Sequence, residues 1–289
     1  MIAKTNMLFL GAGYTAKTMM RNHPSDNMWG TTRQKEKMPA IEAAGATPLI
    51  FKGDAPIEEL SKVISKAEYI LISISPDAEG DITLRYHSDD IINNSKLKWI
   101  GYLSTVGVYG DHEGKWVDET AETQPGSERS RWRKQAEDQW LDIGQAHKLP
   151  VHIFRLPGIY GPGRGPQEKL KKGTARRIEK PGQVFNRAHV EDIAAVLEAS
   201  CQAPAQNRIY NIADDEPAAP QDVIAYAAEI LGIETPPLIP FEEAEMSAMA
   251  RSFYSDNKRI SNKRMKEELG VALKYPTYRE GIKAAIEAV

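Results

Sequence analysis

The sequence predicts an α/β protein with a doubly wound parallel sheet of about seven strands and a smaller, mainly helical carboxy-terminal lobe. Short apolar runs alternate along the chain with longer amphipathic segments, which gives the order strand, helix, strand. The short runs are apolar throughout and do not alternate with polar residues, as expected of strands that helices cover on both faces. With 289 residues, of which 41% are hydrophobic, the chain is long enough to bury such a core.

Five strands with helices between them are expected at the start of the chain. The predicted strands are 7–10, 28–32, 47–51, 69–73 and 99–104, and the predicted helices between them are 14–22, 34–44, 57–66 and 81–94. A sixth strand at 151–156 follows a helix rich in arginine, and a seventh at 208–213 follows the apolar helical segment 189–200. The sheet is therefore expected to continue well past the middle of the chain.

The segment 160–182 interrupts this order with glycine, proline and cations, and we expect a loop with a short helix there. After residue 214 the chain is helical and interrupted by prolines, with helices expected near 220–231, 242–250, 258–269 and 278–288. We predict a larger unit formed by 1–160 plus 187–213, and a smaller lobe formed by 161–186 plus 214–289.

The composition narrows the classes of function. The 37 basic and 40 acidic residues give a net charge of −3, which argues against a general binder of nucleic acid. The single cysteine, Cys201, allows no internal disulfide, and no Cys/His cluster has the spacing of a metal site. No apolar stretch approaches the roughly 20 residues that span a bilayer. We expect a cytoplasmic protein without a metal site, signal peptide or membrane anchor.

A glycine motif follows the first predicted strand. Gly11, Gly13 and Ala16 have the spacing G-x-G-x-x-A at the start of a helix. Glycine there permits a tight turn and a close approach of the backbone to a pyrophosphate, whose charge lies at the positive end of the helix. We expect Gly11, Gly13, Tyr14 and Thr15 to surround the pyrophosphate of a dinucleotide. The alternative is a glycine-containing turn without a ligand.

The end of the second predicted strand favours one of the two nicotinamide dinucleotides. About 20 residues after the glycines, NAD-binding domains carry an Asp or Glu that accepts the ribose hydroxyls. This chain has Gly-Thr-Thr-Arg at 30–33 instead. Thr32 and Arg33 suit a 2′-phosphate, so NADP is predicted in preference to NAD. The alternative is that Arg33 faces solvent at the start of the next helix.

Three further polar residues follow predicted strands. Asp54, after the third strand, could reach the adenine amino group, although it could equally be a loop aspartate. Ser73 and Ser75 lie where the fourth strand meets the cofactor. All three are expected to contribute to the same binding crevice.

The helix rich in arginine raises a separate question. At 3.6 residues per turn, one apolar stripe carries Trp132, Ala136 and Trp140, and Arg129 and Arg133 lie on or beside it. A guanidinium cannot be neutralised and is costly to bury unpaired, so these two side chains should face an anion or a polar cleft. The alternatives are a solvated helix face, or pairing with a carboxylate within the chain: Asp118, Glu119 or Glu122.

An ordered series of motifs resembles the extended short-chain dehydrogenases/reductases, with nucleotide-sugar epimerases and dehydratases nearest in pattern. After the glycine motif come LSTVGVYG at 103–110, VDET at 117–120, FRLPGIYGPG at 154–163, NRAHVEDIA at 186–194 and YNIADDEP at 210–217. The series extends over essentially the whole chain. The resemblance implies an NAD(P)-binding Rossmann domain, a small carboxy-terminal substrate domain, and a structural link between them at His189 and Asp192.

The chain departs from this family at the catalytic residues. The family's substrate-orienting serine or threonine corresponds to Thr105. Its Tyr-x-x-x-Lys pair, counted back from Glu137, corresponds to Arg129 and Arg133. A guanidinium, with a pKa above about 12, cannot exchange a proton with substrate as the tyrosine does. Ordinary tyrosine-driven oxidoreduction is therefore not expected.

Two functions remain open. The first is an NADP-dependent oxidoreductase or isomerase of altered mechanism, in which Arg129 and Arg133 hold a small anionic substrate and Tyr109 or Tyr160 donates the proton. The second is a noncatalytic NADP(H) sensor or scaffold. A nucleotide-sugar substrate is less expected, because Gly158 stands where many sugar epimerases have asparagine. The family also suggests a homodimer paired through the helix at 84–94 and the arginine helix.

Overall fold

A seven-stranded parallel sheet forms the centre of the protein in the computed structural model, which describes residues 5–22, 27–203 and 206–287. The strand order is β11-β7-β5-β4-β1-β2-β3, and every neighbouring pair is parallel. The strands are β1 (Asn6–Leu10), β2 (Asn27–Thr32), β3 (Thr47–Ile50), β4 (Tyr69–Ile72), β5 (Trp99–Thr105), β7 (Val151–Leu156) and β11 (Arg208–Asn211). The predicted doubly wound α/β fold is thereby confirmed.

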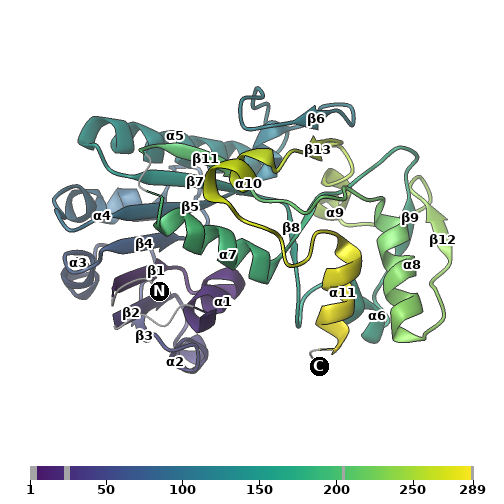
Figure 1. The fold of residues 1–289 in the computed structure, drawn as a ribbon, viewed down its shortest axis with the longest axis horizontal. Helices are drawn as coiled ribbons and strands as arrows, with labels where there is room; N and C mark the ends of the chain where they lie inside the picture. The colour runs from purple at the N-terminus through teal and green to yellow at the C-terminus, as the bar shows by residue number, and fades with distance from the viewer. Residues whose placement is uncertain (1–4, 23–26, 204–205, 288–289) are drawn as a thin grey trace.

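Helices cover both faces of this sheet (Figure 1). One face carries α3 (Glu58–Ile64), α4 (Ile82–Ile92) and α5 (Glu128–His147). The other carries α1 (Tyr14–Asn22), α2 (Met38–Glu42), α7 (Val190–Cys201) and α10 (Lys263–Leu269). Strand β1 shows why the strands are apolar throughout. Met7 and Phe9 are buried under the layer that contains α1 and α7, whereas Leu8 and Leu10 are buried under the layer that contains α3, α4 and α5. Successive side chains of the strand therefore enter opposite layers.

The outer strand β3 contains a proline. Pro48 pairs in register with Gly30 of β2. The N–H of Phe51, directly after β3, donates to the carbonyl of Thr32 at 3.0 Å. Because backbone groups alternate in direction along a strand, position 49 also faces β2, and position 48 faces the open edge.

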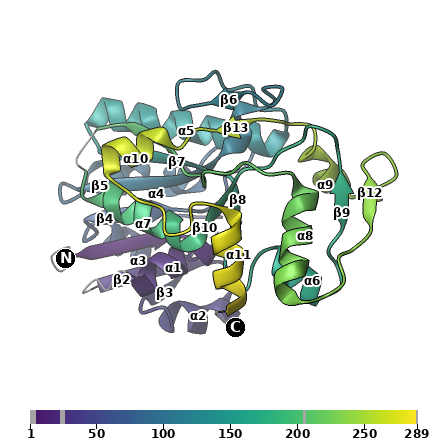
Figure 2. The same ribbon diagram turned by 45° about the vertical axis from the view of Figure 1, so that its right-hand side comes forward.

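A smaller lobe lies beside the carboxyl ends of the central strands (Figure 2). It consists of α6 (Pro166–Lys171), β9 (Arg177–Glu179), α8 (Pro220–Leu231), β12 (Leu238–Pro240), α9 (Ala248–Ser252) and α11 (Tyr278–Glu287). Leu170, Val223, Ala227 and Ile282 are buried together in its core. Strands β9 and β12 pair in parallel at its outer side.

Short strand pairs join segments that are distant in sequence. Strand β8 (Gly158–Tyr160) pairs with β10 (Arg187–His189), and β6 (Trp116–Val117) pairs with β13 (Arg259–Ile260). Two 3₁₀ turns, η1 (Lys35–Lys37) and η2 (Val106–Tyr109), complete the described elements.

Several predicted helix bounds are wrong. The helix expected at 34–44 is divided into η1 and α2, because Pro39 sits in the first turn of α2. Residues 242–247 of the helix expected at 242–250 are not helical, and α9 begins only after the cap Ser247. The segment 258–269 begins as β13 and continues as α10, which packs on α7 and β11 of the sheet. The prediction that 214–289 forms one lobe with 161–186 stays a prediction.

Candidate functional site

The glycine turn after β1 is fixed by side chains from two neighbouring strands. Gly11 has a φ of +94°, which favours glycine, and an added Cβ would lie 2.9 Å from the Ser73 hydroxyl oxygen. The Gly11 N–H donates to the Thr31 hydroxyl at 2.7 Å, and the Ser73 hydroxyl donates to the Gly11 carbonyl. Thr31 was not among the predicted site residues, because the strand pattern does not show which hydroxyl faces the turn.

The space in front of helix α1 fits a pyrophosphate. A Cβ added at Gly13 would meet no heavy atom within 4 Å. Helix α1 begins at Tyr14, and the first N–H groups of a helix have no acceptor within it. Thr15 is buried at this helix start. The open side of Gly13 and the free amides of the first turn therefore form a cradle of the kind that binds a diphosphate.

Tyr14 connects this cradle to the segment that leads into the smaller lobe. Its hydroxyl donates to the carbonyl of Pro162 at 2.9 Å, and the guanidinium carbon of Arg164 lies 5.6 Å from its ring centroid. Burial raises the pKa of the Tyr14 hydroxyl, while the Arg164 charge opposes the shift. Tyr14 is therefore a neutral contact between the glycine turn and residues 162–164.

The end of β2 is followed by three cations, with one carboxylate, Glu36, among them. The Thr32 hydroxyl accepts the N–H of Gln34 at 3.3 Å. Arg33 is exposed and makes no hydrogen bond or ion pair with any residue that the structure describes. Lys35 and Lys37 follow in η1. The Arg33 guanidinium is thus available to an anion at this edge of the sheet.

The remaining predicted cofactor residues differ in their contacts. Asp54 is exposed after β3 and forms no side-chain hydrogen bond or ion pair within the described part of the chain. Ser73 is part of the glycine turn described above. Ser75, after β4, is exposed and accepts from Arg133 Nη2 at 3.4 Å. Strands β1 to β4 end at the same edge, because they are parallel neighbours.

Arg133 lies over the end of β5. Its Nη1 donates to the Leu103 carbonyl at 2.8 Å and to the Tyr102 hydroxyl at 3.2 Å. Together with the bond to Ser75, these contacts hold the guanidinium between the ends of β4 and β5. It forms no ion pair with a described carboxylate, so its charge is held in place without being neutralised.

Arg129, one turn earlier in α5, is exposed. Its Nη1 lies 3.5 Å from the sulfur of Met249, in α9 of the smaller lobe. The interpretation that Asp118, Glu119 or Glu122 neutralises the two arginines is wrong. The Asp118 carboxylate accepts from Thr120, and the Glu122 carboxylate accepts from Gln124. The Glu119 carboxylate accepts the Asn211 N–H and pairs with Arg264.

Thr105 ends β5 and caps the 3₁₀ turn η2. Its hydroxyl accepts the N–H of Gly107 at 3.1 Å, and its side chain is half-buried. A Cβ added at Gly107 would lie 2.7 Å from the Ser130 hydroxyl oxygen, so η2 packs closely on the start of α5. The capping role that a threonine at a strand end can have is thus present.

Both tyrosines considered as proton donors are buried, with their hydroxyls bonded within the protein. Tyr109 is fully buried, and its hydroxyl donates to Asn211 at 2.8 Å. Tyr160 is buried against Gly281 of α11 and donates to the Thr277 carbonyl at 3.3 Å. Burial raises the pKa of both hydroxyls. The expectation that either one donates the proton is wrong, because the core encloses them.

A buried ion pair stands behind the arginine helix. Arg155 of β7 binds Glu137 of α5 through Nη2 at 2.8 Å and through Nε at 3.2 and 3.3 Å. Ser104 donates to the same carboxylate, and the Arg155 guanidinium lies 4.7 Å from the Tyr109 ring centroid. In the sequence, Glu137 served only to align Arg129 and Arg133 with the family's Tyr-x-x-x-Lys pair. In the structure it fixes α5 against β5 and β7.

His189 and Asp192 join α7 to the carboxy-terminal segment. Asp192 accepts the N–H groups of Lys274 at 2.7 Å and Tyr275 at 3.1 Å. His189 accepts the Glu191 N–H through Nδ1, and burial lowers its pKa to about 4. The histidine is therefore a neutral helix cap at neutral pH.

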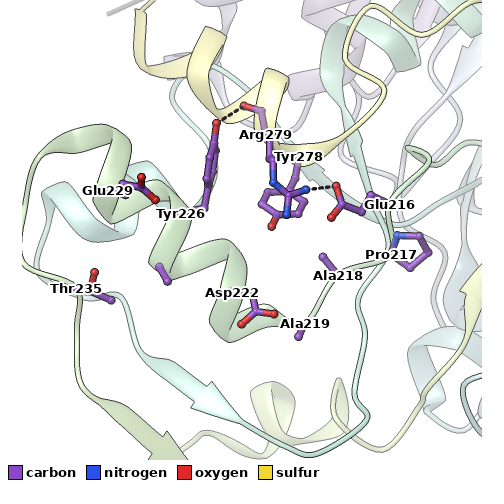
Figure 3. Close-up of a pocket in the computed structure, with 11 residues that line it drawn as sticks. Glu216, Pro217, Ala218, Ala219, Asp222, Tyr226, Glu229, Thr235, Tyr278 and Arg279 are labelled. Atoms are coloured by element: carbon purple, nitrogen blue, oxygen red, sulfur yellow. Dashed lines mark hydrogen bonds and ion pairs between the residues drawn. The ribbon is translucent and has the colours of Figure 1, made fainter.

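A cavity of about 690 Å³ lies apart from these residues, between α8 and the start of α11 (Figure 3). Tyr226, Tyr278, Asp222 and Glu216 are among the residues that line it. The Arg279 guanidinium lies 4.5 Å from the Tyr278 ring centroid and is bound to Glu216. None of the predicted site residues lines this cavity. The cation that lines it is Arg279, which is already paired with Glu216.

The described part of the chain has neither a membrane-spanning helix nor a cluster of metal ligands. No helix there combines the length and apolar composition needed to cross a membrane. No group of three or more His, Cys, Asp and Glu side chains there could hold a metal ion.

Comparison with known proteins gives the family context. The model of the NAD dependent epimerase/dehydratase family matches residues 90–213. Protein YeeZ of Escherichia coli K12 is 34% identical over 186 residues, which are 63% of this chain and 60% of that protein. The chain thus matches less than two thirds of the length of this curated relative.

Solved structures match over nearly the full length. A conserved protein of unknown function from Silicibacter pomeroyi is 50% identical over 98% of this chain and 99% of its own, with a TM-score of 0.91. UDP-glucuronic acid 4-epimerase from Bacillus cereus, solved with NAD, has a TM-score of 0.75 over 98% of both chains at 15% identity, which shows a shared fold. Residues 90–213 thus match the NAD dependent epimerase/dehydratase family, and the whole chain shares its fold with a solved epimerase.

Proposed function

We propose that the protein binds NADP(H) and acts as an oxidoreductase or isomerase of altered mechanism on a small anionic substrate. One observation carries the proposal. Neither Arg129 nor Arg133, which the sequence resemblance aligns with the family's Tyr-x-x-x-Lys pair, forms an ion pair with a described carboxylate. Two charges left without a counterion beside a dinucleotide cradle favour an anionic ligand.

The cofactor assignment rests on the cradle and on Arg33. The open side of Gly13 and the start of α1 suit a pyrophosphate, and the Bacillus cereus neighbour carries NAD on the same fold. Arg33, exposed at the end of β2 and without a partner among the described residues, would contact a 2′-phosphate, with Thr32 beside it. Ser73, Ser75 and Asp54 would complete the crevice.

The arginines suggest how the chemistry differs from that of the family. When NADPH is bound, its nicotinamide supplies hydride chemistry. Arg133, held by the Leu103 carbonyl and the Tyr102 hydroxyl, is a fixed cation that can stabilise a developing oxyanion. Arg129 can hold a carboxylate or phosphate in a fork. The proton would come from solvent, because Tyr109 and Tyr160 are enclosed.

A fluorescence titration with NADPH and NADH tests the cofactor assignment. NADPH should bind more tightly, and Arg33→Ala should weaken NADPH binding by about 10-fold while leaving NADH binding unchanged. Gly13→Val should abolish binding of both without loss of stability, because the added side chain enters open space. Arg131→Ala, which removes an exposed cation of α5, is the control. Tighter binding of NADH, with no effect of Arg33→Ala, would overturn the assignment.

The enzymatic part needs a separate measurement. NADPH oxidation is followed with a panel of carbonyl compounds that carry a carboxylate or phosphate. Activity with at least one of them, lost in Arg129→Ala, is the expected result. Arg129→Ala should leave NADPH binding unchanged, which separates substrate binding from cofactor binding.

The second candidate function is a noncatalytic NADP(H) sensor or scaffold. The burial of Tyr109 and Tyr160 favours this noncatalytic function, because neither hydroxyl is then free to replace that of the family's catalytic tyrosine. Tight NADPH binding without turnover in the whole panel would support the sensor and exclude the enzyme. For either function, we propose pairing of two copies through α4 and α5, which sedimentation equilibrium would test.

A further inference from the structure

Met249 is an unusual neighbour for an arginine side chain. Arg129 Nη1 lies 3.5 Å from its sulfur, a contact between α5 and the short helix α9. A guanidinium has five N–H donors, and a thioether is a weak acceptor. The contact therefore leaves most of the hydrogen-bonding capacity of Arg129 unused, while it places an apolar side chain directly beside the charge.

A second apolar side chain lies on the same face of α9. Phe253 follows Met249 by four residues with α-helical backbone angles at the helix end, so the two side chains point the same way. Met249 is 51% exposed and Phe253 is 64% exposed. Large apolar side chains exposed as neighbours indicate a binding surface more often than isolated ones do.

The opposite side of α9 holds the helix on the smaller lobe. The Arg251 guanidinium lies 4.7 Å from the Phe241 ring centroid and donates to the Ala244 carbonyl at 3.1 Å. Tyr254 is buried in the same cluster. The face that carries Met249 and Phe253 is therefore directed away from this core, and its Met249 contacts Arg129.

The chain after α9 continues along the start of α5. A Cβ added at Gly126, just before α5, would lie 3.5 Å from Asp256 Oδ1. This proximity, independent of Met249, places the chain that follows α9 beside the residues that lead to Arg129. Arg129 and Met249 thus belong to one surface, and Phe253 lies beside Met249 on α9.

We infer that the anionic substrate has an apolar body, an aryl or alkyl chain that bears a carboxylate, and that Met249 and Phe253 determine this specificity. The inference rests on the proposed function and names its substrate class. Arg129 binds the carboxylate, and the α9 face covers the hydrocarbon. A sugar acid fits this surface poorly, because its hydroxyl groups would lose their water against Met249 and Phe253 without gaining hydrogen-bond partners.

Isothermal titration with three probes tests the inference, in the presence and in the absence of saturating NADPH. The probes are 3-phenylpropanoate, its neutral amide and glucuronate. We expect 3-phenylpropanoate to bind about 10-fold more tightly than either of the others. Met249→Gln and Phe253→Gln should each weaken its binding several-fold and leave NADPH binding unchanged. Arg129→Ala should remove the preference for the acid over the amide.

Ile230→Gln is the matched control, because Ile230 is an exposed apolar residue of α8 in the same lobe. This change should leave the binding of NADPH and of the three probes unaltered. The inference is overturned if glucuronate binds as tightly as 3-phenylpropanoate, if the two glutamine variants bind it unchanged, or if it does not bind at about 10 mM. Failure of the proposed function is distinguished by NADPH itself. Loss of NADPH binding in the unaltered protein contradicts the cofactor site, whereas bound NADPH with no preference among the probes contradicts only the substrate class.

Discussion

The buried ion pair between Glu137 and Arg155 gives a sharp test of what holds α5 against the sheet. The side chains of Arg155 and Glu137 are only 4% and 1% exposed, so water screens neither charge. Glu137→Gln keeps the shape of the side chain and removes its charge, which leaves the Arg155 guanidinium buried without a counterion. Removing one partner of such a pair typically costs about 3–5 kcal/mol of unfolding free energy.

Urea unfolding followed by tryptophan fluorescence measures this cost, since Trp140 is buried in the same helix. The matched control is Asp138→Asn, which breaks the partly exposed pair between Lys134 and Asp138 one residue further along α5. That change should cost less than about 1 kcal/mol. The double variant Glu137→Leu with Arg155→Met removes both charges and should recover most of the lost stability.

The reasoning would be refuted if Glu137→Gln and Asp138→Asn destabilised the protein equally. It would also fail if the double variant were less stable than Glu137→Gln alone, because the cost would then come from packing and not from an uncompensated charge. A large loss in Glu137→Gln and its recovery in the double variant are both required.

Three further predictions concern other parts of the structure. The pKa of His189 in the folded protein is about 4, below its ordinary value of 6.5. The contribution of neutral His189 to the free energy of unfolding should therefore be fully present well above pH 6.5 and fall by about 3 kcal/mol as the pH drops to 4. Urea unfolding at pH 7 and pH 4.5 should show a smaller loss of unfolding free energy in His189→Gln than in the unaltered protein. Gly281→Ala would place a Cβ 2.1 Å from the Tyr160 hydroxyl oxygen and should cost about 1–3 kcal/mol in the same assay, whereas Gly126→Ala, with only an ordinary contact, should cost less than about 0.5 kcal/mol; equal effects would contradict the packing at Tyr160. Thr31→Val leaves the Gly11 N–H without its acceptor and should cost about 1–3 kcal/mol and weaken NADPH binding, whereas Thr32→Val should leave stability nearly unchanged; an NADPH titration unaffected by Thr31→Val would show that the turn keeps its shape without this bond.

The sequence predicts the central sheet well because its strands carry a local signal. Residues 7–10 of β1 are all buried, so that strand appears as an uninterrupted apolar run. The glycine turn is predicted for a similar reason, since its spacing and its place between strand and helix are adjacent in the chain. The short pairs β6–β13 and β8–β10 leave no such signal, because two or three residues are too few to show a period.

The candidate site is predicted only in part, because some of its contacts join distant segments. The positions of Arg129 and Arg133 on α5 follow from the resemblance to the family. That Arg129 meets Met249, 120 residues later, depends on how the smaller lobe packs, which helical periodicity does not reveal. The motif around Tyr109 likewise does not show that its hydroxyl turns inward to Asn211. The roles assigned to the cofactor residues stay predictions.

Pro48 in β3 affects how copies of this protein can meet. The outer strand of an open sheet can template a strand from another molecule, since its outward N–H and C=O groups are unpaired. At position 48 the outward donor is missing, so an incoming strand would find a gap in the ladder at the middle of a four-residue edge. Self-association that extends the sheet across this edge is therefore disfavoured, and crowding in a concentrated solution should not convert the native fold into intermolecular β-structure from this side.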